Sequence, residues 1–416
     1  MLVRRRLVPF LFVLYVVAYL DRVNISFAAA EMQADLGLTA AVYGLGAGIF
    51  FIGYFIFEVP SNLALRRFGA RRWIARIMIS WGVLAGLTAF VTNEWQFYLV
   101  RFLLGVAEAG FFPGVVLYLT FWVPRAERAR TMALFLTATA VAGVVGAPIS
   151  GLFLSMDGVL GLQGWQWLFI IEALPAVILG FVVWRRLPDG PQHATWLSQD
   201  QRQGLVEAVS GDSDAVHGVE GLAGAFRSGR VWLLSLLYLS IVIGFYGISL
   251  WLPLIVKRDF ADLGAIGLGL VTAIPYACAV IAMVLVGRSS DRARERRWHL
   301  AIPLLLGAVG LVVAGVFGGT VAFLALCLAT AGIYAALGPF WTLPPAFLRG
   351  VAAAAGIAWI NSVGNLGGFI GPYTLGRLSD SAGGLGLGLI VLGVIVAIAC
   401  VLALGVATAL QRRHDP

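Results

Sequence analysis

Residues 185–204 read RRLPDGPQHATWLSQDQRQG and interrupt a chain that otherwise consists of long apolar runs. The turn Pro188-Asp189-Gly190-Pro191 opens a polar stretch that continues to about Arg230. Six apolar runs precede this stretch and six follow it, each close to the roughly 20 residues needed to cross a bilayer core. The sequence therefore predicts an all-α polytopic membrane protein, with twelve transmembrane helices in two six-helix bundles.

The composition indicates that lipid surrounds most of the chain. Of its 416 residues, 60% are hydrophobic and 12% are charged, whereas a soluble domain has about 25% charged residues. A soluble protein of this size cannot bury so much apolar surface, because too much of it stays outside the core. The first apolar run starts at Leu7, lacks a small-residue cleavage site and ends in Asp21-Arg22, so we expect a retained first span.

The polar stretch divides the chain into three parts. We predict an N-terminal six-helix bundle over residues 1–185, a cytoplasmic central loop over 186–230 and a C-terminal six-helix bundle over 231–416. A weak internal repeat supports this division, because a basic turn follows the second span of each half. The two copies run Asn62-x-x-x-Arg66-Arg67-x-Gly69-x-Arg71-Arg72 and Gly287-x-x-x-Asp291-Arg292.

Basic residues gather on one side of the predicted membrane. Of the 29 Lys and Arg, 24 fall in the termini and in the loops after even-numbered spans. Lys257, Arg258 and Arg377 fall on the other side, and Arg22 and Arg101 lie inside spans. By the positive-inside rule, both termini are then cytoplasmic. The net charge of +8 does not indicate nucleic-acid binding, because no soluble domain gathers the basic residues.

The cysteines and histidines give no sign of a metal, a cofactor or a catalytic set. Cys278, Cys327 and Cys400 stand singly in apolar runs, so we expect buried free thiols. The four histidines lie in loops and near chain ends, without metal spacing or a nucleophile partner. A membrane enzyme or sensor is therefore the least favoured function. A channel is also disfavoured, because no repeated ring of charge occurs.

Charged residues inside the predicted spans are few, and each costs at least about 2.5 kcal/mol to insert. All lie in the first half: Asp21, Arg22, Glu58, Arg101, Glu108 and Glu172. The second half contributes uncharged polar residues, namely Tyr246, Trp341, Asn361, Ser362 and Asn365. An arginine fork binds carboxylates through paired hydrogen bonds, and a carboxyl group in an apolar site can load and release a proton. The pattern favours an anion site anchored on the first half.

Structural ion pairs are an alternative explanation for four of these charges. Asp21 and Arg22 can neutralise each other, although neighbouring side chains on a helix point about 100° apart. Arg101 and Glu108, seven residues apart, share one helix face and can also pair. The position of Glu108 near the middle of its span nevertheless favours a functional role for it.

Four further residues have ordinary packing explanations. Glu58 lies near the cytoplasmic end of its span, where it can hold a neighbouring helix or a loop arginine. Glu172 fits a structural role in the sixth span. Tyr54 and Trp341 lie inside spans, where large aromatic side chains more often pack than bind a ligand.

Several motifs, taken in order, resemble the anion:cation symporter branch of the major facilitator superfamily over nearly the whole chain. The first span carries Tyr19-Leu20-Asp21-Arg22-Val23-Asn24, and the second ends in Glu58-Val59-Pro60-Ser61-Asn62. The most specific stretch is Arg101-x-x-x-Gly105-x-x-Glu108-Ala109-Gly110, followed by Pro113-Gly114, Tyr118, Trp122, Pro124 and Arg125. Also similar are Gly164-Trp165-Gln166-Trp167-Leu168-Phe169-Ile170-Ile171-Glu172, Leu187-Pro188-Asp189 and Trp251-Leu252-Pro253.

The resemblance implies a role for each matching residue. Arg22 is similar to the carboxylate-binding arginine of that family, and Asp21 and Glu108 are similar to its proton-carrying acids. Substrate-lining positions of the sugar-acid members match Tyr54, Trp341 and Asn361. Structural or gating roles fall on Arg101, Glu58, Gly69, Arg71, Asp291 and Arg292. The first loop motif departs from the usual pattern, with Asn62 and Arg66 where Gly and Asp are common.

The function implied is proton-coupled symport of a small organic carboxylate, such as tartrate, a sugar acid or an aromatic acid, into the cell. The resemblance further implies a multi-pass protein of the inner (plasma) membrane that works as a monomer and needs no cofactor. An exchanger or exporter of the same fold is the alternative, since Gly143-x-x-Gly146-x-Pro148 resembles an antiporter pattern. Sodium in place of the proton also remains open.

Overall fold

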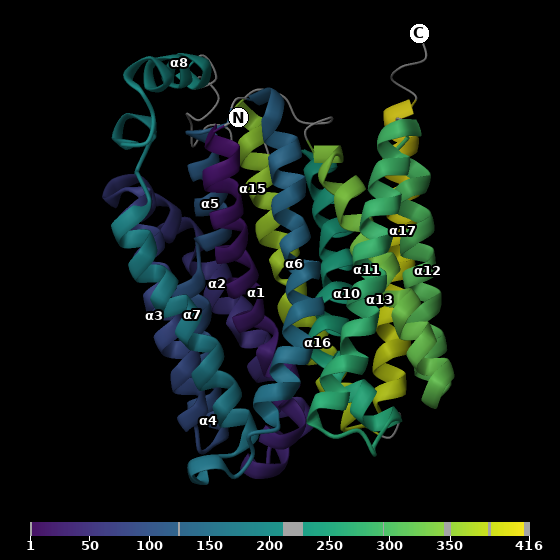
Figure 1. Ribbon diagram of the computed structural model, residues 1–416. Coiled ribbons are helices and arrows are strands. Elements are labelled where there is room, and N and C mark those ends of the chain that lie inside the picture. The colour runs from purple at the N-terminus through teal and green to yellow at the C-terminus, as the bar shows by residue number, and fades with distance from the viewer. Residues whose placement is uncertain are drawn as a thin grey trace.

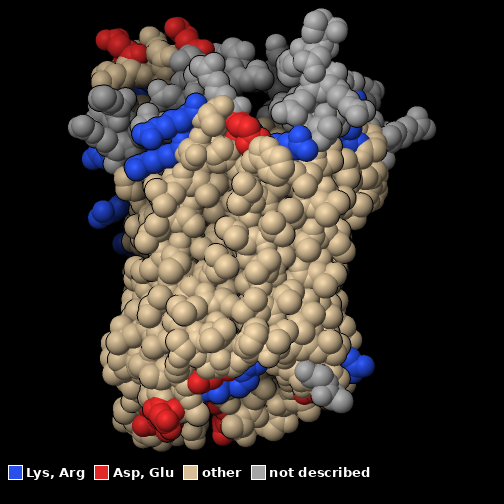
Figure 2. Space-filling view, turned by 90° about the vertical axis from the view of Figure 1, so that its right-hand side faces the viewer, with Lys and Arg blue, Asp and Glu red and all other residues tan. Residues whose placement is uncertain are grey.

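A computed structural model describes residues 2–123, 125–210, 228–293, 295–344, 351–381 and 384–411. Within these ranges all regular secondary structure is helical. The long helices run side by side along one axis (Figure 1). The short helix α8, Gln199–Ser210, projects beyond the ends of the long helices, at the end of the molecule where α1 begins. We call this the basic end, because arginine side chains gather there (Figure 2).

The central loop divides the long helices into two halves. The first half comprises α1 (Leu2–Leu36), α2 (Ala40–Phe68), α3 (Ala70–Leu87), α4 (Glu94–Glu108), α5 (Phe111–Thr120), α6 (Arg125–Leu154) and α7 (Gly164–Arg186). The second half comprises α10 (Gly229–Asp259), α11 (Ala265–Ala293), α12 (Arg297–Val316), α13 (Gly319–Trp341), α15 (Val351–Asn365), α16 (Gly367–Ser379) and α17 (Gly384–Gln411). Single 3₁₀ turns occur at η1 (Thr88–Phe90), η2 (Val159–Gly161) and η3 (Pro191–His193).

The expected membrane fold is confirmed. Eleven segments of the described chain are long and apolar enough to cross a bilayer. The successive helices α15 and α16, joined at Leu366, supply the remaining crossing. Figure 2 shows an uncharged belt between two charged ends, as expected of a surface that faces lipid.

Two spans are broken, which the sequence did not predict. The fourth span stops at Glu108 and restarts at Phe111, because Gly110 adopts the left-handed conformation with φ 83°. A residue with a Cβ is strained at that φ, so glycine suits the break. The eleventh span is interrupted at Leu366, between α15 and α16, although Leu366 itself keeps a right-handed helical conformation with φ -61°. Interrupted helices expose backbone groups, and transporters use them near their binding sites.

The two halves pack closely at the end opposite the basic end, through α2 against α16 and α6 against α11. Glycine permits the approach: a Cβ on Gly44 would lie 2.6 Å from the Pro372 carbonyl oxygen, and one on Gly269 would lie 2.4 Å from that of Ala147. The backbone N–H groups of Ala40 and Ala41 also donate to the Asp380 carboxylate, at 3.2 and 2.8 Å. The halves are therefore closed against each other at this end.

Candidate functional site

The guanidinium of Arg22 lies at the boundary between the two halves of the molecule. Its Nη2 forms an ion pair with Glu108 Oε1 at the end of α4. Its Nη1 donates to the Tyr246 hydroxyl of α10, at 2.9 Å. Both the arginine and the carboxylate are buried. One side chain therefore links α1 and α4 of the first half to α10 of the second, through two charge-assisted contacts.

Aromatic rings of α2 flank the same guanidinium. Its carbon lies 5.4 Å from the ring centroids of both Phe50 and Tyr54, within the range of a cation–π contact. The Phe51 ring lies 4.4 Å from that of Tyr246 and closes the site from the side. Of the predicted substrate-lining residues, Tyr54 thus lies beside Arg22. Burial of the Arg22–Glu108 pair among these rings strengthens the electrostatic interactions within it.

A close approach of α2 and α4 positions Glu108. Gly105 lies one turn before it, and a Cβ there would come within 1.9 Å of the Phe50 carbonyl oxygen. Only glycine lets the two backbones come this near. The break after Glu108 then ends the helix at the site, so the carboxylate stands at a helix terminus instead of within a continuous span.

Arg101 is fully buried, with 0% of its surface exposed. Its guanidinium lies 5.2 Å from the Phe50 centroid, and its Nε donates to the Gly46 carbonyl at 3.4 Å. Its two terminal nitrogens have no hydrogen-bond partner among the described residues. The alternative of a structural Arg101–Glu108 ion pair is therefore wrong for this conformation, because Glu108 pairs with Arg22.

A second contact between the halves involves Glu58 of α2 and Asn361 of α15. The Asn361 Nδ2 donates to Glu58 Oε1 at 3.1 Å. Glu58 lies one turn after Tyr54, so it continues the wall of the Arg22 site towards the basic end. The suggestion that Glu58 holds a neighbouring helix is confirmed. Its partner is a residue that the sequence assigned to the substrate site.

Two predicted site residues lie apart from the Arg22 ion pair. Asp21 accepts a hydrogen bond from Trp81 Nε1 of α3, at 2.8 Å, so it does not neutralise Arg22. Trp341 packs on Tyr238 and Phe340, with ring centroids 4.9 and 5.3 Å away. The alternative of a local Asp21–Arg22 pair is wrong, since the two neighbours point to different sides of α1.

Four of the residues with predicted structural or gating roles, Gly69, Arg71, Asp291 and Arg292, lie at the basic end. In the first half Gly69, with φ 86°, separates α2 from α3, and Asp189 accepts from the Arg71 backbone N–H at 2.8 Å. The Arg71 Nε lies 3.7 Å from the same carboxylate. Asp189 therefore takes the place of an acidic residue in the loop itself. The side chain of Arg66 lies outside the described part of the chain.

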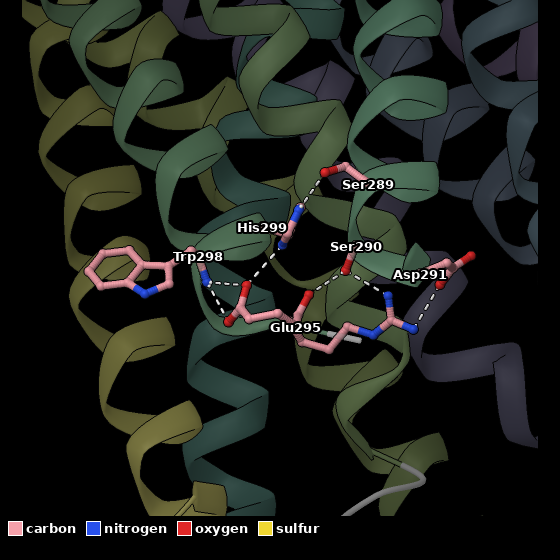
Figure 3. Close-up of polar contacts among 7 residues, drawn as sticks. Ser289, Ser290, Asp291, Glu295, Trp298 and His299 are labelled. Carbon is pink, nitrogen blue, oxygen red and sulfur yellow. Dashed lines mark hydrogen bonds and ion pairs between the residues drawn. The ribbon is translucent and has the colours of Figure 1, made fainter. Parts of the chain in front are cut away.

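The corresponding turn of the second half joins α11 to α12 (Figure 3). Asp291 pairs with Arg296 at 2.7 Å, and Arg296 Nη1 also donates to the Ser290 hydroxyl at 2.6 Å. Arg292, at the end of α11, is exposed. Asp291 thus forms its ion pair within its own turn and not with the first half.

His299 and Glu295 form a titratable contact in the same turn. His299 Nδ1 lies 2.8 Å from Glu295 Oε2, and its Nε2 lies 2.9 Å from the Ser289 hydroxyl. The Glu295 carboxylate also accepts from the Trp298 backbone N–H at 3.0 Å. Burial raises the Glu295 pKa, but the bonds from His299 and from backbone N–H groups outweigh it and hold the pKa below its usual 4.5.

We expect Glu295→Gln to lower thermal stability at neutral pH but not in acid. A carboxylate whose pKa is depressed by folding contributes stability above its unfolded-state pKa, and the contribution is lost as pH falls through the folded value. The contact is only partly buried, so its loss should cost only about 0.5 kcal/mol. Melting curves of the purified protein at neutral pH and below about pH 4 test this. An equal deficit at both values would contradict it.

Sequence reasoning missed two members of the site. Tyr246 stood out only as a polar residue in an apolar run, and nothing local linked it to Arg22, 224 residues away. Phe50 gave no signal, because phenylalanine is common in spans. Within the described residues, no group of three or more His, Cys, Asp or Glu side chains can hold a metal ion. The chemistry available is the binding of an anion and the transfer of protons.

Comparison with known proteins agrees with this fold. The model of the Major Facilitator Superfamily matches residues 11–372, so the chain belongs to that superfamily. It is a transport protein of the membrane and not an enzyme. This match and the relatives described below confirm the resemblance, first drawn from sequence motifs, to organic-anion transporters of the superfamily.

Particular relatives cover almost the whole chain. A protein of Agrobacterium vitis named "Putative tartrate transporter" is 49% identical over 407 residues, covering 96% of this chain and 89% of that protein. A quinolone resistance transporter of Acinetobacter baumannii is 43% identical, covering 98% and 94%. The solved structure of a bacterial homologue of the human lysosomal transporter Spinster, inward-facing and unoccupied, matches with a TM-score of 0.81 at 17% identity, covering 99% and 98%. At that identity the likeness shows the fold alone.

Proposed function

We propose that this protein takes up a small organic carboxylate together with a proton, by alternating access of its two six-helix bundles. The observation that carries the proposal is the Arg22–Glu108 ion pair, buried between the halves and bonded to Tyr246. Its relative named as a tartrate transporter supports a hydroxy acid as the substrate class. Coupling needs no cofactor in this scheme, and one chain suffices.

Charge balance explains how such a site couples anion and proton. In the described conformation Glu108 neutralises Arg22. A substrate carboxylate that joins them leaves one negative charge in excess, and an unpaired buried charge costs several kcal/mol. A proton on Glu108 removes this excess and frees Arg22 Nη2 for the substrate. With a monocarboxylate bound, the loaded site is then neutral and can close and change its exposure, whereas a dicarboxylate such as tartrate requires a second proton.

The direction of opening follows from the packing. The halves are closed at the end opposite the basic end, where α2 meets α16 and α6 meets α11. If the basic end is cytoplasmic, as its arginines favour, this conformation faces inward. Inward facing is the state from which a symporter releases substrate and proton to the cell.

Export or exchange is the competing function, and the quinolone resistance relative favours it. Purified protein in liposomes, supplied with labelled L-tartrate under an inward proton gradient, distinguishes the two. Uptake above equilibrium that stops with a proton ionophore supports symport. Uptake only when unlabelled acid is loaded inside indicates exchange, and uptake that needs sodium indicates another coupling ion. A panel of sugar acids and aromatic acids in the same assay then narrows the substrate.

We expect the central loop, residues 186–230, and both termini to lie in the cytoplasm. His217 lies outside the described residues, but its position in this loop makes it a useful reporter. In a variant with Cys278, Cys327 and Cys400 replaced by serine, His217→Cys should react with a membrane-impermeant maleimide only after cells are opened. Labelling of intact cells would reverse the proposed orientation. Asp262→Cys, in the exposed loop between α10 and α11, is the control for the other side of the membrane, and it should be labelled in intact cells.

A further inference from the structure

A second buried polar cluster lies on the other side of α1 from the Arg22 site. Asp21, 2% exposed, uses only one carboxylate oxygen, Oδ2, which accepts from Trp81. Its Oδ1 has no hydrogen-bond partner. Asn24, one turn further on, is equally buried, and neither the oxygen nor the nitrogen of its side-chain amide has a partner at hydrogen-bond geometry. Such unsatisfied buried groups are costly, so they call for an explanation.

Glu172 of α7 completes this cluster. It is 6% exposed, and its Oε1 accepts from the Ser150 hydroxyl of α6 at 2.8 Å. Its Oε2 has no partner in the described structure. The Asn24 amide lies beside this carboxyl group, and α7 packs directly on α1 and on α3, which carry Asp21 and Trp81. Four helices, α1, α3, α6 and α7, therefore surround two carboxyl groups with an amide beside them.

No cation of the described chain balances these two carboxyl groups. The hydrogen-bond partners of Asp21 and Glu172 are the neutral Trp81 indole and Ser150 hydroxyl, and Arg22 is held by Glu108. The η1 turn, which also packs on α7, has no charged residue. Along the surrounding helices the next charged residues are Glu31 of α1, Arg76 of α3, Arg130 of α6 and Arg185 of α7. The nearest of these cations along its helix, Arg76, precedes Trp81 by about 7.5 Å of helix.

Two carboxylates in a dry cluster without a cation cannot both carry charge. We propose that Asp21 and Glu172 jointly bind one coupled proton, with Asn24 beside them. The inference rests on the proposed proton symport and adds Glu172 to the residues that carry it. It also gives α1 two roles: one face presents Arg22 to the anion beside the Glu108 proton site, and another face presents Asp21 to a second proton. A movement of α1 then acts on both sites at once.

The pH profile of uptake tests this pairing. In liposomes with the membrane potential held at zero, we expect Glu172→Gln to keep exchange of labelled tartrate. As the pH is raised, this variant should stop accumulating tartrate against its gradient at a pH about one unit or more below that of wild type. The reason is that Asp21 has lost the negative neighbour that helps it to retain the proton. Glu172→Asp should restore the profile. Ser150→Ala, which removes the hydrogen bond but no acid, should leave the profile unchanged.

A measurement without substrate makes the outcome independent of the proposed function. The infrared band of protonated carboxyl groups in the purified protein should titrate at lower pH in Glu172→Gln, and should lose amplitude when Asp21→Asn is added. Unchanged profiles and an unchanged band in Glu172→Gln would overturn the pairing. Failure of the wild type itself to accumulate any acid would instead overturn proton symport, whereas the infrared result would still decide whether the pair holds a proton.

Discussion

Arg22→Lys is expected to weaken binding of the substrate carboxylate by about ten- to a hundredfold while the protein still folds. Lysine keeps the positive charge but loses the planar fork, so it cannot contact Glu108, Tyr246 and a carboxylate with fixed geometry. Loss of a charge-assisted hydrogen bond costs about 1.5–3 kcal/mol, which corresponds to this range of affinity. The stacking against Phe50 and Tyr54 should weaken as well.

Equilibrium binding of labelled acids to the purified protein measures this effect. Arg67→Lys provides a matched control, since Arg67 is exposed at the basic end of α2. The melting temperature of Arg22→Lys should remain near that of the wild type, because the Glu108 carboxylate keeps a cation beside it. Wild-type affinity in Arg22→Lys would place the anion elsewhere. Arg101, whose terminal nitrogens lack partners, would then be the next residue to test.

Glu108→Gln is expected to abolish accumulation driven by a proton gradient while exchange of the anion continues. Glutamine fixes the position in a neutral form that resembles the protonated acid. Without substrate, Arg22 then lacks its ionic partner, and breaking a buried pair costs about 3–5 kcal/mol. The substrate carboxylate can replace that partner. The variant should therefore melt earlier than wild type when empty and gain more thermal stability on adding the anion.

Three measurements in one preparation distinguish the possible results. Counterflow in liposomes reports exchange, uptake under a proton gradient reports coupling, and melting with and without tartrate reports binding. Glu94→Gln, at the start of the same helix, is the control for α4. The coupling role assigned to Glu108 is falsified if Glu108→Gln still concentrates the acid as well as wild type. Asp21→Asn should also impair coupling. Its effect on substrate binding should be smaller than its effect on coupling, because the Asp21 carboxylate faces Trp81 and not Arg22.

The membrane fold could be predicted because its signals are sums over many residues. A span of about twenty apolar residues, or an excess of arginine on one side of the membrane, can still be recognised when a single residue departs from the pattern. The break at Gly110 depends on a single residue in a chain that contains many glycines, so the sequence did not distinguish it.

The partners of the buried charges were harder to predict, because sequence spacing favours near neighbours. Arg101 lies seven residues from Glu108 and on the same helix face, yet the ion pair forms with Arg22, 86 residues away. Asp21 likewise has Arg22 beside it in sequence but bonds to Trp81, 60 residues on. Tertiary packing decides between such alternatives, and only a pattern over many related sequences or a structure contains that information.

Asp380 bears on the balance between the two access states. Its carboxylate accepts from the first two N–H groups of α2, and both bonds join the halves at the end that is closed here. A negative charge at a helix N-terminus contributes about 0.3–1 kcal/mol. A molecule open at this end would lose this contribution, so Asp380 favours the population closed at this end by about two- to fivefold before any substrate binds. In the proposed orientation, the empty transporter would favour the state closed to the outside, and the rate of opening to the outside would depend on a residue far from the bound substrate.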